Sequence, residues 1–234
     1  KIKGLAQYNR DHPGTLLHAK SYRDQNVFKD KKVLIVGGSI STANLVQYVA
    51  PVAKEVFISR RNPHLVWTWI NQGLEAKGLN TKPFITEFEG NTVKFSDGSE
   101  ESDFDVVLFT SGYHYHYPFL TEHLKVIDPS NTSRVKGLYL QTFAIDDPTL
   151  AIAGVAISAI NFHTIEANAA AIAGVFSGAK TLPPKEEQIK WEEARVKALG
   201  DSVFFHYYNH STVKEEYVDP LYIYAPPGRY NPLE

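Results

Sequence analysis

The chain has 234 residues and a formal net charge of −2 at pH 7, with 43% apolar and 21% charged residues. This composition is globular and excludes a disordered or fibrous chain. The near-zero charge argues against nucleic acid as a main partner, because counterion release requires clustered Lys and Arg. The longest apolar stretch, residues 150–160, is far shorter than the ~18 residues of a membrane span. No charged-then-apolar leader opens the chain, and we therefore expect a cytoplasmic protein.

Cysteine and methionine are both absent. The lack of Cys excludes disulfide scaffolds, zinc–thiolate sites, Cys nucleophiles and dithiol redox chemistry within these residues. The chain begins at Lys1, which is a poor residue to follow a removed initiator. Together with the motifs described below, this start predicts a fragment of a longer protein.

The first half contains a predicted βαβ unit. Residues 33–36, Val-Leu-Ile-Val, form a short apolar run that ends in two glycines and indicates a buried parallel strand. Residues 39–50 place apolar side chains at helical spacing before Pro51. Residues 55–59 are a second apolar run, so strand, glycine turn, helix and strand follow one another within about 30 residues.

The rest of the chain predicts a mixed α/β fold. Residues 81–89 and 91–95 alternate polar and apolar side chains around a turn at Asp97-Gly98, which predicts a small antiparallel excursion. We expect a buried strand at 106–109 and two short strands at 137–142 and 150–154. Helices are expected at 160–176 and at 185–199, the latter with a charged, solvated face. The aromatic run at 204–208 is expected to belong to the core or to an interface, in preference to a stacking platform for bases.

The glycine turn resembles a dinucleotide-binding fingerprint. Gly37, Ser39 and Thr42 occupy the three positions of G-x-G-x-x-G. Gly37 permits the tight turn, and the helix start presents unpaired N–H groups to a pyrophosphate, with the hydroxyls of Ser39 and Ser41 as further donors. Thr42 in place of glycine predicts looser helix–strand packing. A plain strand–turn–helix junction with a Ser N-cap is the alternative.

The end of the second strand indicates which dinucleotide is bound. An NAD-binding protein has an Asp or Glu about 20 residues after the turn, where it binds the ribose 2′-hydroxyl. This chain has Ser59-Arg60-Arg61 there instead. Two arginines suit a 2′-phosphate and favour NADP, whereas an ordinary solvated basic pair is the alternative.

Three further segments resemble one enzyme family. Gly14, His18 and Tyr22 match F-x-G-x-x-x-H-x-x-x-Y/W, with His12 in place of Phe. Residues 105–113, which end in Gly112-Tyr113, resemble D-x-V-x-x-A-T-G-Y. Residues 137–143, then 150–154 and the helix with Glu166, are similar to the closing stretch of the same proteins. These are the flavin-containing monooxygenases, and the segment Gly-Gly-Ser-Ile-Ser-Thr-Ala-Asn is most similar to fungal members.

The resemblance covers about residues 10–185 and implies the C-terminal half of a flavoprotein with two dinucleotide-binding domains. It implies a linker and the end of a first FAD-domain segment at 1–24. A Rossmann-like NADP-binding domain is expected at 25–113, and the returning C-terminal part of the FAD domain at 114–234. The family's first G-x-G-x-x-G, for FAD, has no counterpart here. We therefore expect an N-terminal half or a second chain to complete the FAD site.

In this family NADPH reduces FAD, and oxygen then forms a C4a-hydroperoxide on the reduced flavin. The NADP⁺ that stays bound shields this hydroperoxide from water until an amine or sulfide attacks its distal oxygen. His18 and Tyr22 would link the two domains, and the helix start near Asn161 would face the flavin. No catalytic side chain is predicted. The residues expected to bind a cofactor are Gly37, Ser39, Ser41, Thr42, Asn44, Arg60, Arg61, His18, Tyr22, Gly112, Tyr113, Gln141 and Phe143.

Other functions compete with this one. A catalytically silent NADP-binding module is possible, as is a relative of the pyridine-nucleotide disulfide reductases, although the absence of Cys leaves the latter no dithiol. The pairs His114/His116 and His206/His210 have metal-ligand spacing. Neither has a third ligand at matching spacing, so no metal is expected.

Overall fold

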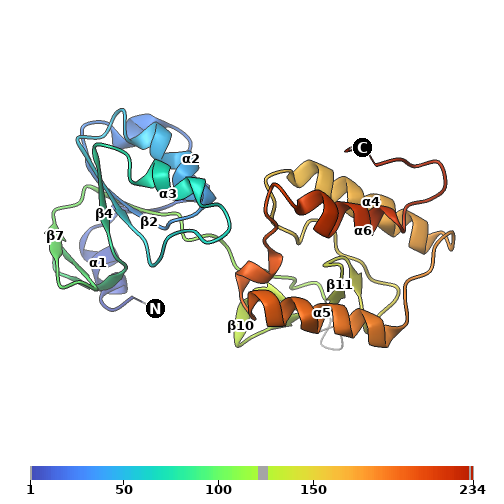
Figure 1. Ribbon diagram of the computed structural model, residues 1–234. Coiled ribbons are helices and arrows are strands. Elements are labelled where there is room, and N and C mark those ends of the chain that lie inside the picture. Colours follow the sequence, from blue (N-terminus) through green and yellow to red (C-terminus); the bar gives the residue numbers. More distant parts are fainter. Residues whose placement is uncertain (1, 121–125, 232, 234) are drawn as a thin grey trace. The chain divides into compact units, whose positions relative to one another are not determined.

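The computed structural model describes residues 2–120, 126–231 and 233. The chain forms two compact units, Lys1–Gly112 and Tyr113–Glu234 (Figure 1). The boundary between the units lies one residue before the domain boundary expected from the sequence. The assignment of one unit to NADP and the other to FAD stays a prediction at this point.

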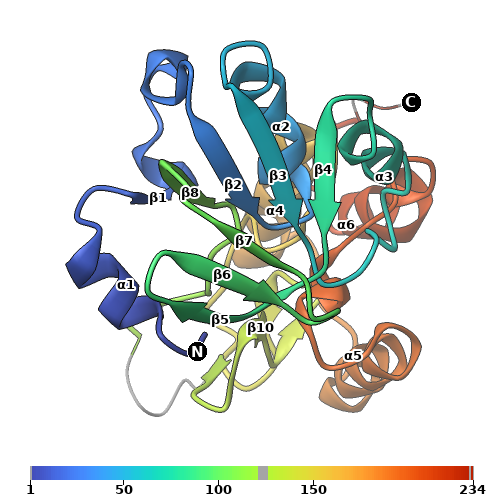
Figure 2. The ribbon, with the colours of Figure 1, turned by 90° about the vertical axis from the view of Figure 1, so that its left-hand side faces the viewer.

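The first unit is built on a five-stranded parallel sheet, which confirms the predicted α/β class. The two buried apolar runs at 33–36 and 55–59 form adjacent strands in register, with Val33 opposite Val56. Strand 106–109 pairs on the other side. Figure 2 shows the strands side by side in the order β1 (Leu16–His18), β8 (Val106–Phe109), β2 (Lys32–Val36), β3 (Glu55–Ser59) and β4 (Leu79–Lys82).

Helices connect these strands as a parallel sheet requires. Helix α2 (Ile40–Val49) joins β2 to β3, and α3 (Trp69–Leu74) joins β3 to β4. Residues 2–24, which we expected to form a linker and the end of a first FAD-domain segment, are part of this compact unit. Their helix α1 (Leu5–Asp11) contacts the segment Ile85–Glu89, and β1 is a strand of the sheet. Two short 3-10 helices, η1 (Ala19–Ser21) and η2 (Gln25–Phe28), follow β1.

The antiparallel excursion predicted after the βαβ unit is present as three strands. They are β5 (Ile85–Glu89), β6 (Thr92–Phe95) and β7 (Glu100–Ser102), with the Asp97-Gly98 turn between the last two. The expected single segment 81–89 is divided, because residues 79–82 pair in parallel with β3. Pro83 lies at the division, where a residue without an N–H cannot continue a ladder.

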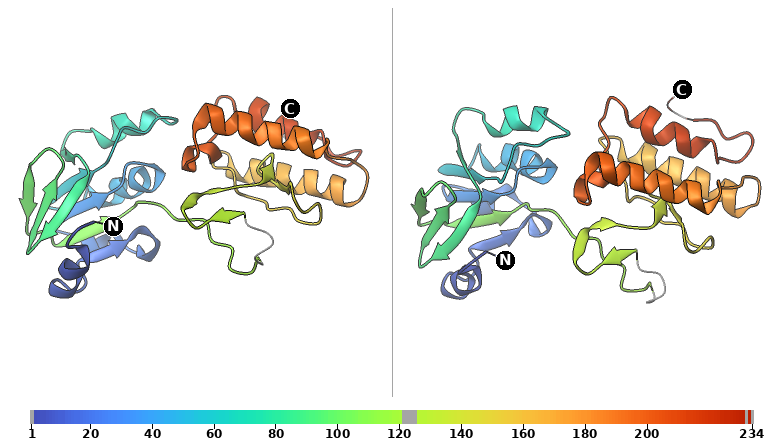
Figure 3. Two further views of the ribbon diagram at one scale, coloured as in Figure 1. Left: turned by 90° about the horizontal axis from the view of Figure 1, so that it is seen from below. Right: turned by 60° about the horizontal axis from the view of Figure 1, so that its bottom comes forward.

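The second unit packs helices against two small hairpins. The hairpins contain β9 (Ile127–Asp128) with β10 (Asn131–Val135), and β11 (Leu138–Tyr139) with β12 (Phe143–Ala144). Helix α4 (Asn161–Phe176) lies beside α6 (Asp219–Tyr222), and α5 (Lys185–Leu199) lies against β11 (Figure 1). Figure 3 shows α4 and α5 from two further sides, in yellow-orange and orange. The 3-10 helix η3 (Val203–His206) and the π-helix η4 (Lys214–Val218) connect α5 to α6.

Two strands expected here are shorter than predicted. The expected strand 137–142 ends at Tyr139, because Leu140 and Gln141 have φ of 46° and 50° and turn the chain into β12. The Thr142 hydroxyl supports this turn by donating to the Leu140 carbonyl at 2.8 Å. The expected strand 150–154 is reduced to one bridge, between Ala151 and Phe143.

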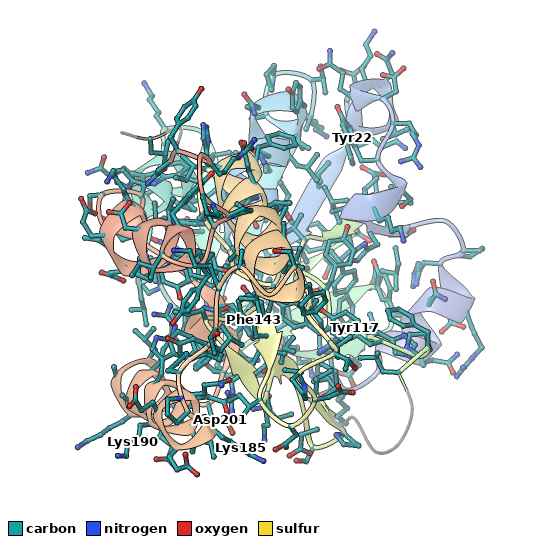
Figure 4. All side chains as sticks on the ribbon, turned by 90° about the vertical axis from the view of Figure 1, so that its right-hand side faces the viewer. Tyr22, Tyr117, Phe143, Lys185, Lys190 and Asp201 are labelled. Carbon is teal, nitrogen blue, oxygen red and sulfur yellow. The ribbon has the colours of Figure 1, made fainter. Side chains whose placement is uncertain are left out.

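Both predicted helices of this unit are confirmed, and the aromatic run is core. Phe205, His206 and Tyr208 are buried. The charged face of α5 is only partly solvated. Figure 4 shows Lys185 and Lys190 projecting outward from it, but Glu192 accepts hydrogen bonds from Arg134 and from the Gly137 N–H, both at 2.8 Å. In the part of the chain described, no helix is both long and apolar enough to cross a membrane.

Candidate cofactor-binding site

The glycine turn lies at the carboxyl edge of the parallel sheet, where ligands of open α/β sheets bind. Gly37 has φ 151°, and a Cβ there would lie 2.3 Å from Thr110 Oγ1. A Cβ on Gly38 would lie 2.9 Å from Cβ of Arg60. Both positions therefore need glycine because the turn passes directly against the ends of β8 and β3.

Thr42, at the third fingerprint position, fastens the helix to the sheet. Its side chain is fully buried, and its hydroxyl lies 2.8 Å from that of Thr110. Thr110 also donates to the Val36 carbonyl at 3.0 Å. The expectation of looser packing is therefore replaced by a hydroxyl pair that bridges α2 and the end of β8. Contact between Thr42 and a nucleotide stays a prediction and would have to use its backbone N–H.

The start of α2 has the donors that a pyrophosphate needs. Ser39 is the N-cap residue, yet its side chain makes no capping bond to the helix. The first-turn N–H groups, with the positive end of the helix dipole, therefore suit an anion. Ser41 is half-buried and Asn44 is exposed in the first two turns. This donor set fits the phosphate groups of a dinucleotide.

The two adjacent arginines differ in environment. Arg60 has a side chain that is only 8% exposed; it donates to Asn71 Oδ1 at 2.9 Å and forms an ion pair with Glu75. Arg61 is exposed. From the sequence alone, both arginines were expected to bind the nucleotide. In the structure, the Arg60 guanidinium bonds residues of α3 and its C-terminal end, whereas the Arg61 side chain lies at the surface beside the end of β3.

His18 and Tyr22 both lie in the first unit. His18 ends β1, where its Nδ1 accepts the Lys20 N–H at 3.2 Å and its carbonyl accepts the Ser21 hydroxyl at 2.7 Å. The Tyr22 ring stacks between those of Phe28 and Tyr48, at 6.0 and 6.1 Å between centroids. Tyr22 thus packs against α2 through Tyr48. A role for this pair in linking domains stays a prediction.

Gly112 and Tyr113 stand at the boundary of the two compact units. Gly112 has φ 83°, and Tyr113 is exposed. The conformation of Gly112 is one that favours glycine, so the last motif of the first unit ends on a residue suited to a sharp change of chain direction. Cofactor contact by these two residues stays a prediction.

Gln141 and Phe143 have buried side chains (Figure 4 labels Phe143). The Gln141 amide donates to the Tyr208 hydroxyl at 2.9 Å, and its oxygen accepts from His206 Nδ1 at 2.7 Å. Because Val135 N–H donates to His206 Nε2 at 3.0 Å, the imidazole must carry its proton on Nδ1. Contact between a cofactor and the Gln141 side chain stays a prediction, and it would require this network to break.

The segment before α4 is held by a second buried network. Asn168 donates to the hydroxyls of Thr142 and Tyr217, at 2.7 and 2.8 Å, and accepts the Gly154 N–H at 3.2 Å. Gly154 is exposed. No side-chain bond caps the α4 N-terminus at Ile160. This end of α4 therefore presents N–H groups on a rigidly held loop, which suits the partial negative charge of a flavin pyrimidine.

Comparison with known proteins decides the family. A model described as flavin-binding monooxygenase-like matches residues 4–80 and 70–224. The chain belongs to this family. Its members are flavoproteins that depend on FAD and NADPH, the two cofactors expected from the sequence. The parallel sheet and the Gly37 turn therefore belong to a flavin-binding monooxygenase-like chain, and their role as its dinucleotide-binding core stays a prediction.

Individual relatives agree with this assignment. The chain is 34% identical over 177 residues to trimethylamine monooxygenase of Methylocella silvestris, covering 75% of this chain and 38% of the relative. It is 26% identical to the flavin-containing monooxygenase ustF2 of Aspergillus flavus, covering 88% and 46%. The structure of S-allyl-L-cysteine S-oxygenase from Allium sativum superposes with TM-score 0.73 at 26% identity, covering all of this chain and 53% of that one. The chain thus spans about half the length of these relatives or less.

The network around Arg60 was not predicted from the sequence. His64 and Asn71, which lie between β3 and the middle of α3, join Arg60 to the N-cap residue of α2. No motif contains these residues, and neither a lone His in a loop nor a lone Asn in a short helix gives a signal of its own. Only the fold brings them to the glycine turn.

Proposed function

We propose that this chain is the NADP-binding and C-terminal part of an NADPH- and FAD-dependent monooxygenase that oxygenates soft nucleophiles, an amine nitrogen or a sulfur. The observation that carries the proposal is the strand–turn–helix of β2 and α2, with Arg61 exposed at the end of β3, in a chain of the flavin-binding monooxygenase-like family. Within it, the first unit binds NADP(H) and the second contributes to the FAD site.

The preference for NADP over NAD is assigned to Arg61. Its guanidinium is at the surface, whereas that of Arg60 is engaged by Asn71 and Glu75. A 2′-phosphate would therefore bind Arg61, with Arg60 fixing the backbone from which Arg61 extends. The pyrophosphate would lie on the α2 N-terminus, against the N–H groups and the hydroxyls of Ser39 and Ser41.

The substrate class is inferred from relatives. One is named for trimethylamine and one for a cysteine thioether; both compounds offer an uncharged lone pair on nitrogen or sulfur. When bound, FAD reduced by NADPH supplies the activated oxygen. The residues of this chain would orient the nicotinamide and exclude water, and no side chain here need act as acid, base or nucleophile.

The FAD site would be completed by residues outside this sequence. Along α4, Phe162, Ile165 and Phe176 are exposed at helical spacing, and Phe162 is 90% exposed. Exposed apolar stripes of this kind mark surfaces that another element covers. The chain spans half or less of its curated relatives, and we assign this face of α4 to the remaining half of the FAD domain.

The test combines the chain with the part of a relative that it does not span. The chain is expressed alone, and together with the N-terminal half of the Methylocella silvestris trimethylamine monooxygenase. We expect stoichiometric FAD absorbance only in the combination. Oxygenation of trimethylamine or a thioether is then measured by mass spectrometry with NADPH as reductant. Stoichiometric FAD on the chain alone would contradict the proposed division of the FAD site.

A catalytically silent NADP-binding module is the second candidate. It predicts that the chain binds NADP⁺ but that the combination neither holds flavin nor oxygenates any amine or sulfide. A disulfide-reductase relative predicts NADPH-dependent thiol release from a disulfide. The same preparation therefore separates the three functions.

A further inference from the structure

His64 is held at the start of α2 by a network that begins at Arg60. It is buried in the loop between β3 and α3. Its backbone N–H donates to Asn71 Oδ1 at 2.8 Å, and Asn71 Nδ2 donates to the His64 carbonyl at 3.1 Å. Asn71 Oδ1 also accepts from Arg60 at 2.9 Å. The side-chain amide of Asn71 thus bonds both the backbone N–H and the carbonyl of His64.

The hydrogen bonds define the tautomer of the imidazole. The Trp67 backbone N–H donates to His64 Nδ1 at 2.9 Å, so Nδ1 has no proton. Burial lowers the pKa of His64 below its usual value, which keeps the ring neutral near pH 7. A neutral ring with an unprotonated Nδ1 carries its proton on Nε2. Nε2 lies 3.1 Å from Ser39 Oγ and therefore donates to it.

This bond sets the direction of the Ser39 hydroxyl. Because Oγ accepts from His64, the hydroxyl proton is directed away from the imidazole, as donation to a phosphate oxygen would require. Ser39 occupies the second glycine position of the fingerprint, where the backbone closely approaches a pyrophosphate. A side chain at this position must be held in a defined orientation to avoid obstructing the ligand.

We propose that His64 is a positioning residue for NADP(H), which holds the Ser39 hydroxyl so that it donates to the dinucleotide pyrophosphate. The inference rests on the proposed function, because it needs the pyrophosphate to lie at α2. It explains how serine can replace the second glycine: the hydroxyl supplies a donor, and His64 holds it in the donating orientation.

Two conservative variants separate the two nitrogens of the ring. In His64→Asn, the amide oxygen can take the place of Nδ1 and accept the Trp67 N–H, but no donor reaches Ser39. In His64→Gln, the amide nitrogen can take the place of Nε2 and donate to Ser39. We expect His64→Asn to weaken NADP⁺ binding about tenfold, as for loss of one hydrogen bond to a charged group. His64→Gln should stay within about twofold of wild type, because it keeps that donor.

The measurement is calorimetric titration of the whole chain with NADP⁺ and with adenosine 2′-monophosphate, which has the 2′-phosphate but no pyrophosphate. A positioning role requires the NADP⁺ effect of His64→Asn to be absent with adenosine 2′-monophosphate. It also requires His64→Asn to add nothing in a Ser39→Ala background. Ser39→Ala leaves the bonds of His64 to Asn71 and Trp67 in place, so it tests the hydroxyl even if His64→Asn fails to fold.

The outcomes are distinct. If wild type binds NADP⁺ and Ser39→Ala binds it equally well, the inference is overturned and the proposed function stands. The same holds if His64→Asn weakens both ligands alike or adds fully to Ser39→Ala, because a general loss of loop structure would produce those results. If wild type binds adenosine 2′-monophosphate and NADP⁺ with the same affinity, the pyrophosphate contributes nothing to binding and the inference is overturned, while NADP⁺ binding by the chain stands. If wild type binds neither ligand, the NADP site itself is wrong and both proposals fail.

Discussion

Arg60 donates a hydrogen bond to Asn71 Oδ1 at 2.9 Å, and the same oxygen accepts the backbone N–H of His64. The first arginine of the pair thus acts within the protein. It links the end of β3 to α3 and, through His64, to the start of α2. Arg61, one residue later, is exposed. Two adjacent residues of the same type therefore have separable roles.

The first prediction uses this separation. Arg61→Ala should reduce the preference for NADP⁺ over NAD⁺ by roughly 10- to 150-fold, which corresponds to about 1.5–3 kcal/mol for a charged hydrogen bond. Thermal stability should be unchanged, because the side chain is at the surface. Both affinities are measured by titration. Equal preference in Arg61→Ala and wild type would remove Arg61 from the site.

Arg60→Ala is the matched variant. It should lower the unfolding midpoint of the first unit, since it breaks a partly buried ion pair and leaves Asn71 with one donor fewer. Any loss of nucleotide affinity should affect NADP⁺ and NAD⁺ alike. A selective loss of NADP⁺ binding in Arg60→Ala would reverse the roles assigned to the two arginines.

Much of the first unit was predictable because its strands are short apolar runs between charged and glycine residues. The run at 33–36 and the run at 55–59 have buried side chains on both faces, which a parallel sheet requires. Residues 79–82 have the sequence Leu-Asn-Thr-Lys, and only Leu79 is apolar. This segment is an edge strand that pairs with β3. Its polar and apolar residues alternate with those that follow, so the sequence alone indicates part of a hairpin.

Residues of the candidate site could be predicted from the sequence only where they belong to a recognisable motif. Gly37 and Ser39 follow a recognisable strand, so the turn could be located. His64 reaches that turn from the next loop and is held there by Asn71 of α3, so its position depends on how α3 packs. In the second unit, Leu140 and Gln141 adopt positive φ against their intrinsic preference. The buried bonds of Gln141 to His206 and Tyr208 compensate for that cost, and they join residues about 65 positions apart.

The second prediction concerns Gly37. Gly37→Ala would place a Cβ 2.3 Å from Thr110 Oγ1 and 2.8 Å from its carbonyl oxygen. We expect the first unit to lose at least about 2–3 kcal/mol, as for overpacking with a backbone shift. The matched control is Gly98→Ala, whose φ is also positive but whose Cβ would meet nothing within 4 Å. It should cost only about 1 kcal/mol.

Chemical unfolding of both glycine variants, followed by circular dichroism, gives the comparison. The difference in the free energy of unfolding between the two variants gives the cost of the contact between the turn and the end of β8, separated from the general cost of a positive φ. Equal destabilisation would mean that the contact with Thr110 relaxes freely, and the glycine would then be needed for its φ alone.

The third prediction is a pH dependence of stability. Burial, assisted by Arg134 and Arg195, lowers the pKa of His206 from 6.5 to about 3. A group with a depressed folded pKa binds its proton more readily when unfolded. Its stabilising contribution is therefore complete above pH 6.5 and is lost as the pH falls toward 3, by up to about 1.4 kcal/mol per pH unit.

His206→Gln tests this dependence. The glutamine oxygen can accept the Val135 N–H in place of Nε2, although the bond to Gln141 is lost, at a cost of about 1–3 kcal/mol. The free energy of unfolding should be lower than wild type at pH 7.5 but should fall less between pH 6.5 and 4.5. His210→Gln, at an exposed residue, should keep the wild-type slope. A wild-type slope in His206→Gln would assign the acid sensitivity to other groups.

The fourth prediction concerns the exposed face of α4. Phe162 is 90% exposed, so Phe162→Ser should leave the unfolding midpoint of the chain unchanged. It should weaken association with the complementing N-terminal half, by roughly 2–4 kcal/mol if the ring becomes a buried hot spot there. The exposed Lys190→Ser on α5 is the control. Equal flavin recovery with Phe162→Ser and wild type would mean that α4 does not contact the added half.

The last prediction concerns coupling of NADPH oxidation to oxygenation. The family resemblance implies that His18 and Tyr22 fix the two domains relative to each other, and the structure shows His18 joining β1 to η1 through bonds to Lys20 and Ser21. In the FAD-loaded combination, His18→Ala should loosen this segment and admit water to the flavin. NADPH would then be consumed with release of hydrogen peroxide in place of oxygenated product.

The ratio of peroxide to product should rise several-fold while the NADP⁺ affinity of the chain stays within about twofold, since the donors at α2 are untouched. The exposed His210→Ala is the control. Unchanged coupling in His18→Ala would leave His18 with the local role of capping η1, and a parallel loss of NADP⁺ affinity would place its effect on binding instead of on water exclusion.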